Sequence, residues 1–379
     1  MSLLAKQTAS LNCLDLFAGV GGFSKAAIDI GINVRAAVEI DHHACESYRF
    51  NLINTSPKPP KLYEADIRIL DPKKVALDAF PSYAKCDLIL GGPPCQGFSV
   101  HRIKGSGVND PRNELLFQYF AFVAELRPKL FLLENVPGIL WERHKSFLNR
   151  FTEESEKIGY RIIGPTLLDA RDYGVPQRRR RIFLLGIRND LSGAPVWPPP
   201  PTHQSPTAID RDPKRLPWES CKHVFRAANK NDMNDLHMVH GSELIEAFKN
   251  TPKNGGSRSE SGRTLKCHAN HDGHKDVYGR IDPSKPAPTM TTACVNPSKG
   301  RFVHPTRNHG ITVRQAARIQ TFPDDFVFTG GIIAAAKQIG NAVPIKLGHT
   351  LLQSLATYLI EERAEQIHCN STELLASNA

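Results

Sequence analysis

The stretch LNCLDLFAGVGGFSKAAIDIG (residues 11–31) decides the fold of the chain. Residues 11–17 are an apolar run of strand length, the loop AGVGG follows, and FSKAAIDIG has the pattern of a short helix that ends at Gly31. A glycine turn between a strand and a helix presents backbone N–H groups at the helix N-terminus, where a polar or anionic ligand can bind. The stretch therefore predicts the first unit of a ligand-binding α/β domain.

A second strand is expected at residues 34–40 (VRAAVEI), and Glu39 stands near its end, twenty residues after Gly19. A carboxylate in this place can accept hydrogen bonds from the two hydroxyl groups of a ribose. The GxGxxG pattern of dinucleotide-binding proteins requires glycine at position 24, where this chain has Ser24. The combination favours an adenosine-bearing cofactor and weakens, without excluding, a nicotinamide or a flavin.

More strands are expected further along the chain. Apolar runs of strand length occur at residues 86–92 and 128–136, and another pair of such runs brackets the sequence RDYGVPQRRR. Strands that alternate with helices imply a parallel sheet with helices on both faces. The predicted fold class is therefore α/β, with a doubly wound, Rossmann-like sheet.

Between residues 195 and 307 no periodic pattern persists in the proline-rich, glycine-rich and polar sequence. A helix is expected again within residues 310–326, with Thr312 at its N-cap and Pro323 just past its end, and a final helix spans roughly residues 345–365. The sequence thus predicts two domains. They are a catalytic, cofactor-binding domain of residues 1–188 plus 335–379 and a smaller, irregular domain of residues 189–334.

Composition limits the classes of function. The 379 residues carry a formal net charge of +10, which favours a polyanionic partner such as nucleic acid. No apolar run approaches the ~18 residues of a membrane span, and the N-terminal sequence lacks the core of a signal peptide. The eight cysteines show no CxxC spacing, so we expect a cytoplasmic protein with reduced thiols.

Cys95, in the sequence GGPPCQGFS, is the candidate nucleophile. It directly follows the strand CDLIL, and open α/β sheets place their active sites at the carboxyl ends of strands. A buried structural cysteine is the common alternative. Two preceding prolines and a glycine-containing loop after Cys95 favour exposure instead, and residues 97–110 are expected to form a lid over the thiol.

Charged groups are expected near the same edge. Glu134 in ENVPG ends a strand, where a half-buried carboxyl group can hold a proton or bind a base. A capping or ion-paired glutamate is the alternative. In PQRRRRIF, strand alternation sends Arg179 and Arg181 to one face and Arg178 and Arg180 to the other. One pair can reach a site, unless the run is only a cationic edge that prevents aggregation.

The blocks DLFAGVGGFS, VEID, GGPPCQGFS, ENVPG, QRRRR, RQAARIQTFPD and QIGNAVP, in this order, resemble the DNA cytosine-5 methyltransferases of bacteria and phages. The resemblance implies the methyltransferase fold and S-adenosylmethionine as cofactor. It places Phe17 on the adenine, Glu39 at the ribose hydroxyl groups and Asp66 at the adenine amino group. The other cofactor-binding residues that it implies are Gly19, Val20, Gly21, Ile40, Ile67, Pro94, Leu116, Asn341 and Ala342.

The resemblance also implies methyl transfer to C5 of a cytosine that has been flipped out of duplex DNA. Cys95 would bond covalently to C6 and so make C5 nucleophilic. Glu134 would contact N3 and the amino group of the base. Arg181, with Arg179 behind it, would supply cationic donors to O2 and help to lower the pKa of the thiol.

Residues 189–277 would be the target-recognition region of such an enzyme, and Arg263 and Lys266 are candidates to enter the major groove. The cysteine and histidines of residues 267–274 match no standard metal site, so no metal is expected. The segment PAPTMTT (residues 286–292) resembles one that follows the recognition region in the family. Its role is left open.

The expected partner is double-stranded DNA, and the expected state is a cytoplasmic monomer. A restriction endonuclease acting on the same site is a further expected partner, unless the enzyme is solitary. Three alternatives stay open. Gly97 and Phe98 speak against the tRNA-modifying branch of the family, and the intact set of Cys95, Glu134 and Arg181 speaks against a catalytically silent DNA-binding protein. A dinucleotide oxidoreductase has no use for the PPCQ or ENV sequences.

Overall fold

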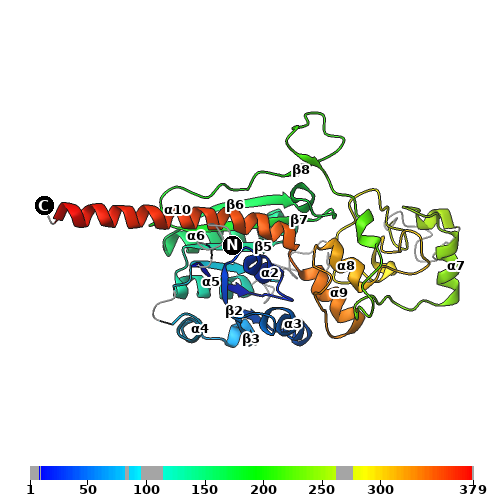
Figure 1. Ribbon diagram of the computed structural model, residues 1–379, viewed down its shortest axis with the longest axis horizontal. Coiled ribbons are helices and arrows are strands. Elements are labelled where there is room, and N and C mark those ends of the chain that lie inside the picture. Colours follow the sequence, from blue (N-terminus) through cyan, green and yellow to red (C-terminus); the bar gives the residue numbers. More distant parts are fainter. Residues whose placement is uncertain (1–7, 9, 82–84, 95–113, 262–275, 378–379) are drawn as a thin grey trace.

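The computed structural model describes residues 8, 10–81, 85–94, 114–261 and 276–377. Its strands are β1 Asn12–Leu16, β2 Asn33–Glu39, β3 Lys61–Glu64, β4 Leu88–Gly91, β5 Leu130–Asn135, β6 Tyr160–Asp169, β7 Arg180–Arg188, β8 His203–Gln204 and β9 Leu216–Pro217. Its α-helices are α2 Gly22–Asp29, α3 His42–Tyr48, α4 Pro72–Ala79, α5 Glu114–Leu126, α6 Lys145–Lys157, α7 Ser242–Asn250, α8 Val313–Ile319, α9 Gly331–Asn341 and α10 Ile345–Ser377. Figure 1 shows how these elements are arranged.

A seven-stranded sheet forms the centre, with the order β3-β2-β1-β4-β5-β7-β6. The first five strands pair in parallel, whereas β7 pairs antiparallel with both β5 and β6. The sequence predicts a parallel sheet, and β7 departs from it because no crossover helix separates it from β6. Only the 3₁₀ turn Ala170–Tyr173 and a short loop connect the two strands. The start of β7 therefore lies at the edge where the parallel strands end.

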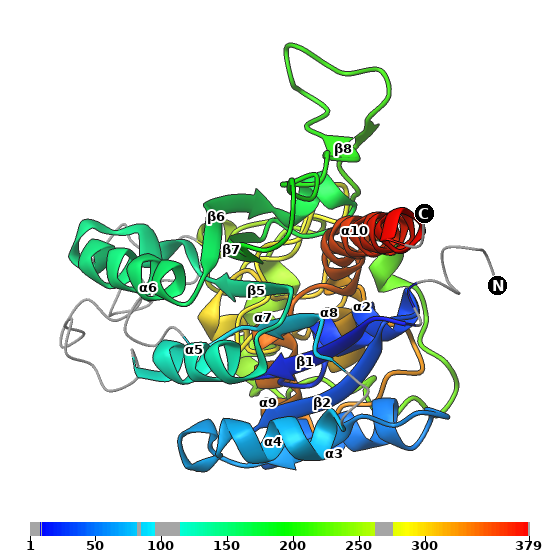
Figure 2. The same cartoon turned by 90° about the vertical axis from the view of Figure 1, so that its left-hand side faces the viewer.

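Helices cover both faces of this sheet, which confirms the predicted doubly wound α/β fold. Figure 2 shows α4, α5 and α6 on one face and α2 and α10 on the other. Along β1, Leu14 and Leu16 pack into the core on the α5 side and Cys13 packs into the core on the α2 side. Gly31 has φ of 93° and occupies the predicted C′ position after α2.

A second lobe lies on the right of Figure 1 and holds α7, α8 and long loops. We call the described residues of 221–330 the small lobe. The predicted N-cap Thr312 is confirmed, because its side chain caps α8 in a capping box with Gln315. The helix ends at Ile319, earlier than predicted, where Thr321 takes up a positive φ of 63°. Helix α9, between the two lobes, has no counterpart among the predicted helices.

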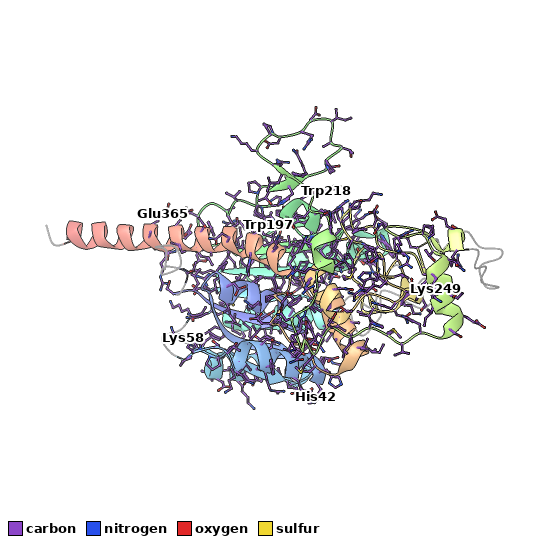
Figure 3. The ribbon with its side chains drawn as sticks, turned by 45° about the vertical axis from the view of Figure 1, so that its right-hand side comes forward. His42, Lys58, Trp197, Trp218, Lys249 and Glu365 are labelled. Carbon is purple, nitrogen blue, oxygen red and sulfur yellow. The ribbon has the colours of Figure 1, made fainter. Side chains whose placement is uncertain are left out.

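Two features extend from the sheet domain. Helix α10 begins at Ile345, as predicted, but continues to Ser377, and its end projects on the left of Figure 1. The loop that carries β8 and β9 projects at the top of Figure 2, and Trp197 and Trp218 lie at its base (Figure 3). Their indole N–H groups donate to the side chains of Thr166 and Asp172. In the described part of the chain, no helix is both long and apolar enough to cross a membrane.

Buried arginine side chains hold the irregular small lobe together. Arg280, Arg314 and Arg318 are all at most 5% exposed. Arg314 pairs with Asp232, and Arg318 pairs with Asp324. Buried carbonyl groups need a hydrogen-bond donor, and a guanidinium group offers five N–H bonds. Arg280 donates to the carbonyl oxygens of Phe248, Thr251, His304 and Arg307 and to the side-chain oxygen of Asn308.

Replacing Arg280 by methionine should destabilise the protein, because three buried carbonyl groups and one partly buried carbonyl group lose their donor. The free energy of unfolding, measured by urea denaturation, should fall by about 2 to 5 kcal/mol. Arg211→Met, on the exposed surface of the projecting loop, is the matched control and should change it by less than about 0.5 kcal/mol. Equal stability of the two variants would contradict the structural role of Arg280.

Candidate active site

Among the described site residues, Glu39, Glu134 and Arg181 lie at one edge of the sheet. The last residues of neighbouring strands are in register, since Leu16 pairs with Val38 and Gly91, and Gly91 pairs with Leu133. The loops that follow β1, β2 and β4 and the end of β5 therefore lie side by side. Arg181, at the start of the antiparallel β7, is brought to the same edge.

Glu39 ties the glycine turn after β1 to the end of β2. Its Oε2 accepts the backbone N–H of Gly19 at 2.8 Å, and its Oε1 accepts those of Ile40 and Asp41 at 2.9 and 2.7 Å. Because a carboxylate has about four acceptor positions, the described residues leave one on Oε2 for a ligand hydroxyl group. Burial raises the pKa of Glu39, against the opposing effect of the three N–H groups.

The surface above this turn is open and partly apolar. A Cβ added to Gly19 would meet no described atom within 4 Å. Phe17 has a positive φ of 57°, a strained conformation for an aromatic residue and one found at functional sites. The side chain of Phe17 is half-buried and packs against the core cluster that contains Ile67, and Ile40 is 63% exposed. Val20 is fully buried in the core on the α2 side. These features fit adenosine, which needs an apolar contact for its ring beside acceptors for its ribose.

Gly21 and Gly22 allow the turn to pack closely against other parts of the chain. A Cβ on Gly21, whose φ is 91°, would lie 2.5 Å from a leucine methyl group, and one on Gly22 would lie 2.6 Å from the carbonyl oxygen of Val343. The second contact brings the end of α9 against the turn. The predicted residues Asn341 and Ala342 therefore adjoin it, although they are far away in the sequence.

Three further predicted cofactor residues differ in their surroundings. Asp66 caps the 3₁₀ turn that follows it, and its carboxylate binds the guanidinium of Arg68, which lowers the pKa of Asp66. A ligand amino group would have to share this carboxylate with Arg68. Pro94 is exposed, whereas Leu116 is buried in the core on the α5 side.

Glu134 and Arg181 form an ion pair at the edge of the sheet. Nε of Arg181 lies 2.8 Å from Oε1 of Glu134, and both side chains are largely buried. The N–H bond of Arg181 is not directed at this oxygen, so Oε1 has no hydrogen bond among the described residues. Gly92 lies against the other oxygen, where an added Cβ would approach to 3.2 Å. Glu134 thus offers a buried acceptor that a ligand N–H group can satisfy.

Arg179 lies in a different environment from Arg181. It is 1% exposed and donates to the carbonyl oxygens of Met290, Gly340 and Ala342 at 3.0 to 3.1 Å. Burial lowers its pKa, but a guanidinium group keeps its proton in proteins. The structure therefore gives the two arginines different contacts, one with a carboxylate and one with the backbone of distant segments.

The structure contains a buried hydrogen-bond network next to the glycine turn whose residues were not among those predicted for the site. Oδ2 of Asp15 accepts the backbone N–H and the hydroxyl group of Ser24 at 3.1 and 2.6 Å, and the Tyr48 hydroxyl donates to Ser24 at 2.8 Å. All three side chains are buried. Ser24 stands where the GxGxxG pattern has its third glycine, and its hydroxyl group provides a hydrogen bond to Asp15 that glycine could not make. The signal was present in the sequence, since Asp15 is the only charged residue of the apolar run 11–17.

Several predicted residues lie outside the described part of the chain, so their roles stay predictions. They are Cys95, the lid of residues 97–110, Arg263, Lys266, and the cysteine and histidines of residues 267–274. The approach to Cys95 is described: Asn135 donates to the carbonyl oxygen of Pro93 at 3.4 Å and so ties this loop to the end of β5. Within the described ranges, no cluster of histidine, cysteine and acidic residues could hold a metal ion.

Known proteins resemble this chain over most of its length. A family model described as C-5 cytosine-specific DNA methylase matches residues 11–357. The chain is 32% identical to the Type II methyltransferase M1.HphI of Haemophilus parahaemolyticus, over 91% of this chain and 87% of the relative. It is 31% identical to M.DdeI of Desulfomicrobium norvegicum, over 92% and 89%. A solved structure described as a DNA modification methyltransferase of an E. coli prophage aligns with a TM-score of 0.69 and 26% identity, over 92% of this chain and 99% of that one.

Replacing Asp15 by asparagine should change how stability depends on pH. Burial raises the pKa of Asp15 to about 7 from an ordinary value of 3.8. Between these two values the folded protein binds more protons than the unfolded chain, so this group lowers the stability increasingly as the pH rises. Urea denaturation at about pH 5 and about pH 8 should show Asp15→Asn gaining stability relative to the wild type at the higher pH. A difference that is the same at both pH values would count against the buried carboxyl group.

Proposed function

Because the chain belongs to the C-5 cytosine-specific DNA methylase family, it is a DNA cytosine-5 methyltransferase, and we propose that it acts on a cytosine flipped out of a specific site in duplex DNA. The observation that carries the proposal is the Glu134–Arg181 pair, which lies at the same edge of the sheet as the glycine turn. A buried carboxylate oxygen without a hydrogen bond suits the amino group of cytosine, and a guanidinium group suits O2. The Type II relatives support action at a specific site.

Enzymes of this family use S-adenosylmethionine, which supplies an electrophilic methyl group. The residues at the glycine turn fit this molecule. The acceptor position left on Oε2 of Glu39 would bind a ribose hydroxyl group. Phe17 would contact the adenine, and the open space at Gly19 leaves room for the methionine part. Asn341 and Ala342 would close the opposite side.

Four side chains would activate the cytosine. The thiolate of Cys95 adds to C6, which breaks the C5–C6 double bond and makes C5 nucleophilic. Glu134 holds a proton at N3 and accepts the amino N–H, while Arg181, with Arg179 behind it, donates to O2 and offsets the added charge. After C5 has been methylated, a base removes the C5 proton, the electron pair restores the double bond, and the thiolate leaves.

We assign recognition of the DNA sequence to the domain of residues 189–334. Residues 189–277 of this domain would contact the DNA bases, because long loops outside a packed core are free to differ between enzymes of different specificity. The net charge of +10 supports binding to the DNA polyanion. A restriction endonuclease that acts on the same site is the proposed protein partner, since the relatives are Type II methyltransferases.

Methylation of a plasmid in cells that express the protein tests the reaction. Bisulfite sequencing should find protected cytosines at one short sequence, and tritium from labelled S-adenosylmethionine should enter duplex DNA and not tRNA. Cys95→Ser should abolish both signals, because a serine hydroxyl is a far weaker nucleophile near neutral pH. Cys221→Ser, in the small lobe, is the control and should stay active. Cys95→Ser activity within about tenfold of the wild type would remove Cys95 from the mechanism.

Replacing Glu39 by alanine should weaken the binding of S-adenosylmethionine by about 1 to 3 kcal/mol, because a charged hydrogen-bond acceptor is lost. Binding of DNA in the absence of cofactor should hardly change. Isothermal titration calorimetry measures the first quantity, and Glu125→Ala, on the exposed side of α5, is a control that should leave it unchanged. Unchanged cofactor affinity in Glu39→Ala would show that the ribose contact is wrong.

A further inference from the structure

The segment PAPTMTT (residues 286–292), which we call the strap, runs beside the chain that leads into β7. The backbone N–H of Arg178 donates to the carbonyl oxygen of Ala287 at 2.8 Å, and the N–H of Ala287 donates to that of Pro176 at 2.9 Å. The hydroxyl group of Thr289 donates to the carbonyl oxygen of Arg178 at 2.5 Å. The strap is thus fixed to the residues just before the β7 arginines.

Gln177 joins the strap to the end of α8. Its side chain is fully buried, its Oε1 accepts the backbone N–H of Met290 at 2.8 Å, and its Nε2 donates to Oε1 of Gln320 at 2.8 Å. Gln320 is fully buried as well, and its Nε2 donates to the carbonyl oxygens of Ile339 and Ala342 at 2.6 and 3.0 Å. The two amides form one directed chain of hydrogen bonds from the strap to the end of α9.

Arg179 reaches the same carbonyl groups from the other side. It donates to Gly340 and Ala342 with one terminal nitrogen and to Met290 with the other. A Cβ on Gly340 would lie 2.3 Å from the carbonyl carbon of Thr291, so the end of α9 touches the strap directly. A buried polar cluster packed this closely has no room for one member to move alone.

The cluster ends at two functional groups. Arg181, at the start of β7, follows Arg179 by two residues and pairs with Glu134. Asn341 and Ala342 adjoin the glycine turn, which is the cofactor side under the proposed function. A ligand that fixes Asn341 and Ala342 also fixes the carbonyl oxygen of Ala342, to which Arg179 donates. Arg179 and the neighbouring Arg181 are then already ordered when a second ligand binds at Arg181.

We propose that Gln177 is a positioning residue that couples the cofactor site to the cytosine-binding arginine, so that each ligand raises the affinity for the other. This inference rests on the proposed function. Coupling between two binding sites is reciprocal, so it can be measured from either ligand. If Gln177 only stabilised the fold, its replacement would change the affinity for each ligand alone. The factor by which one ligand raises the affinity for the other would then stay the same.

The test measures the affinity for S-adenosylhomocysteine by calorimetry, with and without a DNA duplex that carries the site mapped by bisulfite sequencing. In the wild type, DNA should tighten binding by at least about fivefold. Gln177→Met removes the hydrogen bonds at similar side-chain length and should reduce this ratio to below about twofold, with each single affinity within about threefold of the wild type. Gln353→Met in α10 is the matched control and should keep the wild-type ratio, because its Nε2 has no partner among the described residues.

Thermal unfolding shows whether Gln177→Met folds. If it does not, Thr289→Val replaces it, since this variant loses only the hydroxyl contact of the strap, and it should lower the ratio at least about twofold. The proposed coupling would be wrong if DNA changed the affinity of the wild type for S-adenosylhomocysteine by less than about twofold. It would also be wrong if a folded variant kept the wild-type ratio of the affinities with and without DNA. A wild-type protein that binds no S-adenosylhomocysteine and methylates no DNA would instead overturn the proposed function.

Discussion

Every buried backbone carbonyl group needs a hydrogen-bond donor, and in the irregular parts of this protein buried side chains supply many of these donors. The small lobe depends on this supply most, because long loops make up much of it. Arg280 alone holds four carbonyl groups, and Arg314 and Arg318 add contacts to both backbone and carboxylates. The lobe is therefore organised as much by buried guanidinium groups as by apolar packing.

The same constraint connects the two lobes. The strap and the end of α9 present carbonyl groups to which the side chains of Arg179 and Gln320 donate. Gln177 accepts the backbone N–H of Met290 in the strap and donates to Gln320. These donors lie in the chain just before Arg181 and just after α8. The position of a charged group at the site edge is thus set by hydrogen bonds to segments that are far away in the sequence.

The sheet supplies the remaining geometry. Its parallel strands bring Glu39 and Glu134 to one edge, and the antiparallel β7 adds Arg181 to that edge without a crossover helix. Beneath the glycine turn, Asp15 and Ser24 fix the start of α2. Such an edge can hold two ligands side by side, because neighbouring strands are only about 5 Å apart.

The sequence by itself determined the local features. Apolar runs located six of the seven strands of the central sheet, all except β3. Gly31 and Thr312 marked helix boundaries, and Glu39 and Glu134 were identified as strand-end residues, because such signals depend only on neighbouring residues and on a period of two or 3.6. Only the tertiary structure decided the direction of β7 and the different contacts of Arg179 and Arg181. Alternation along a strand places both arginines on one face but does not show what each one meets there. Their partners come from segments more than a hundred residues away or from another strand, and chain folding, not local pattern, brings these together.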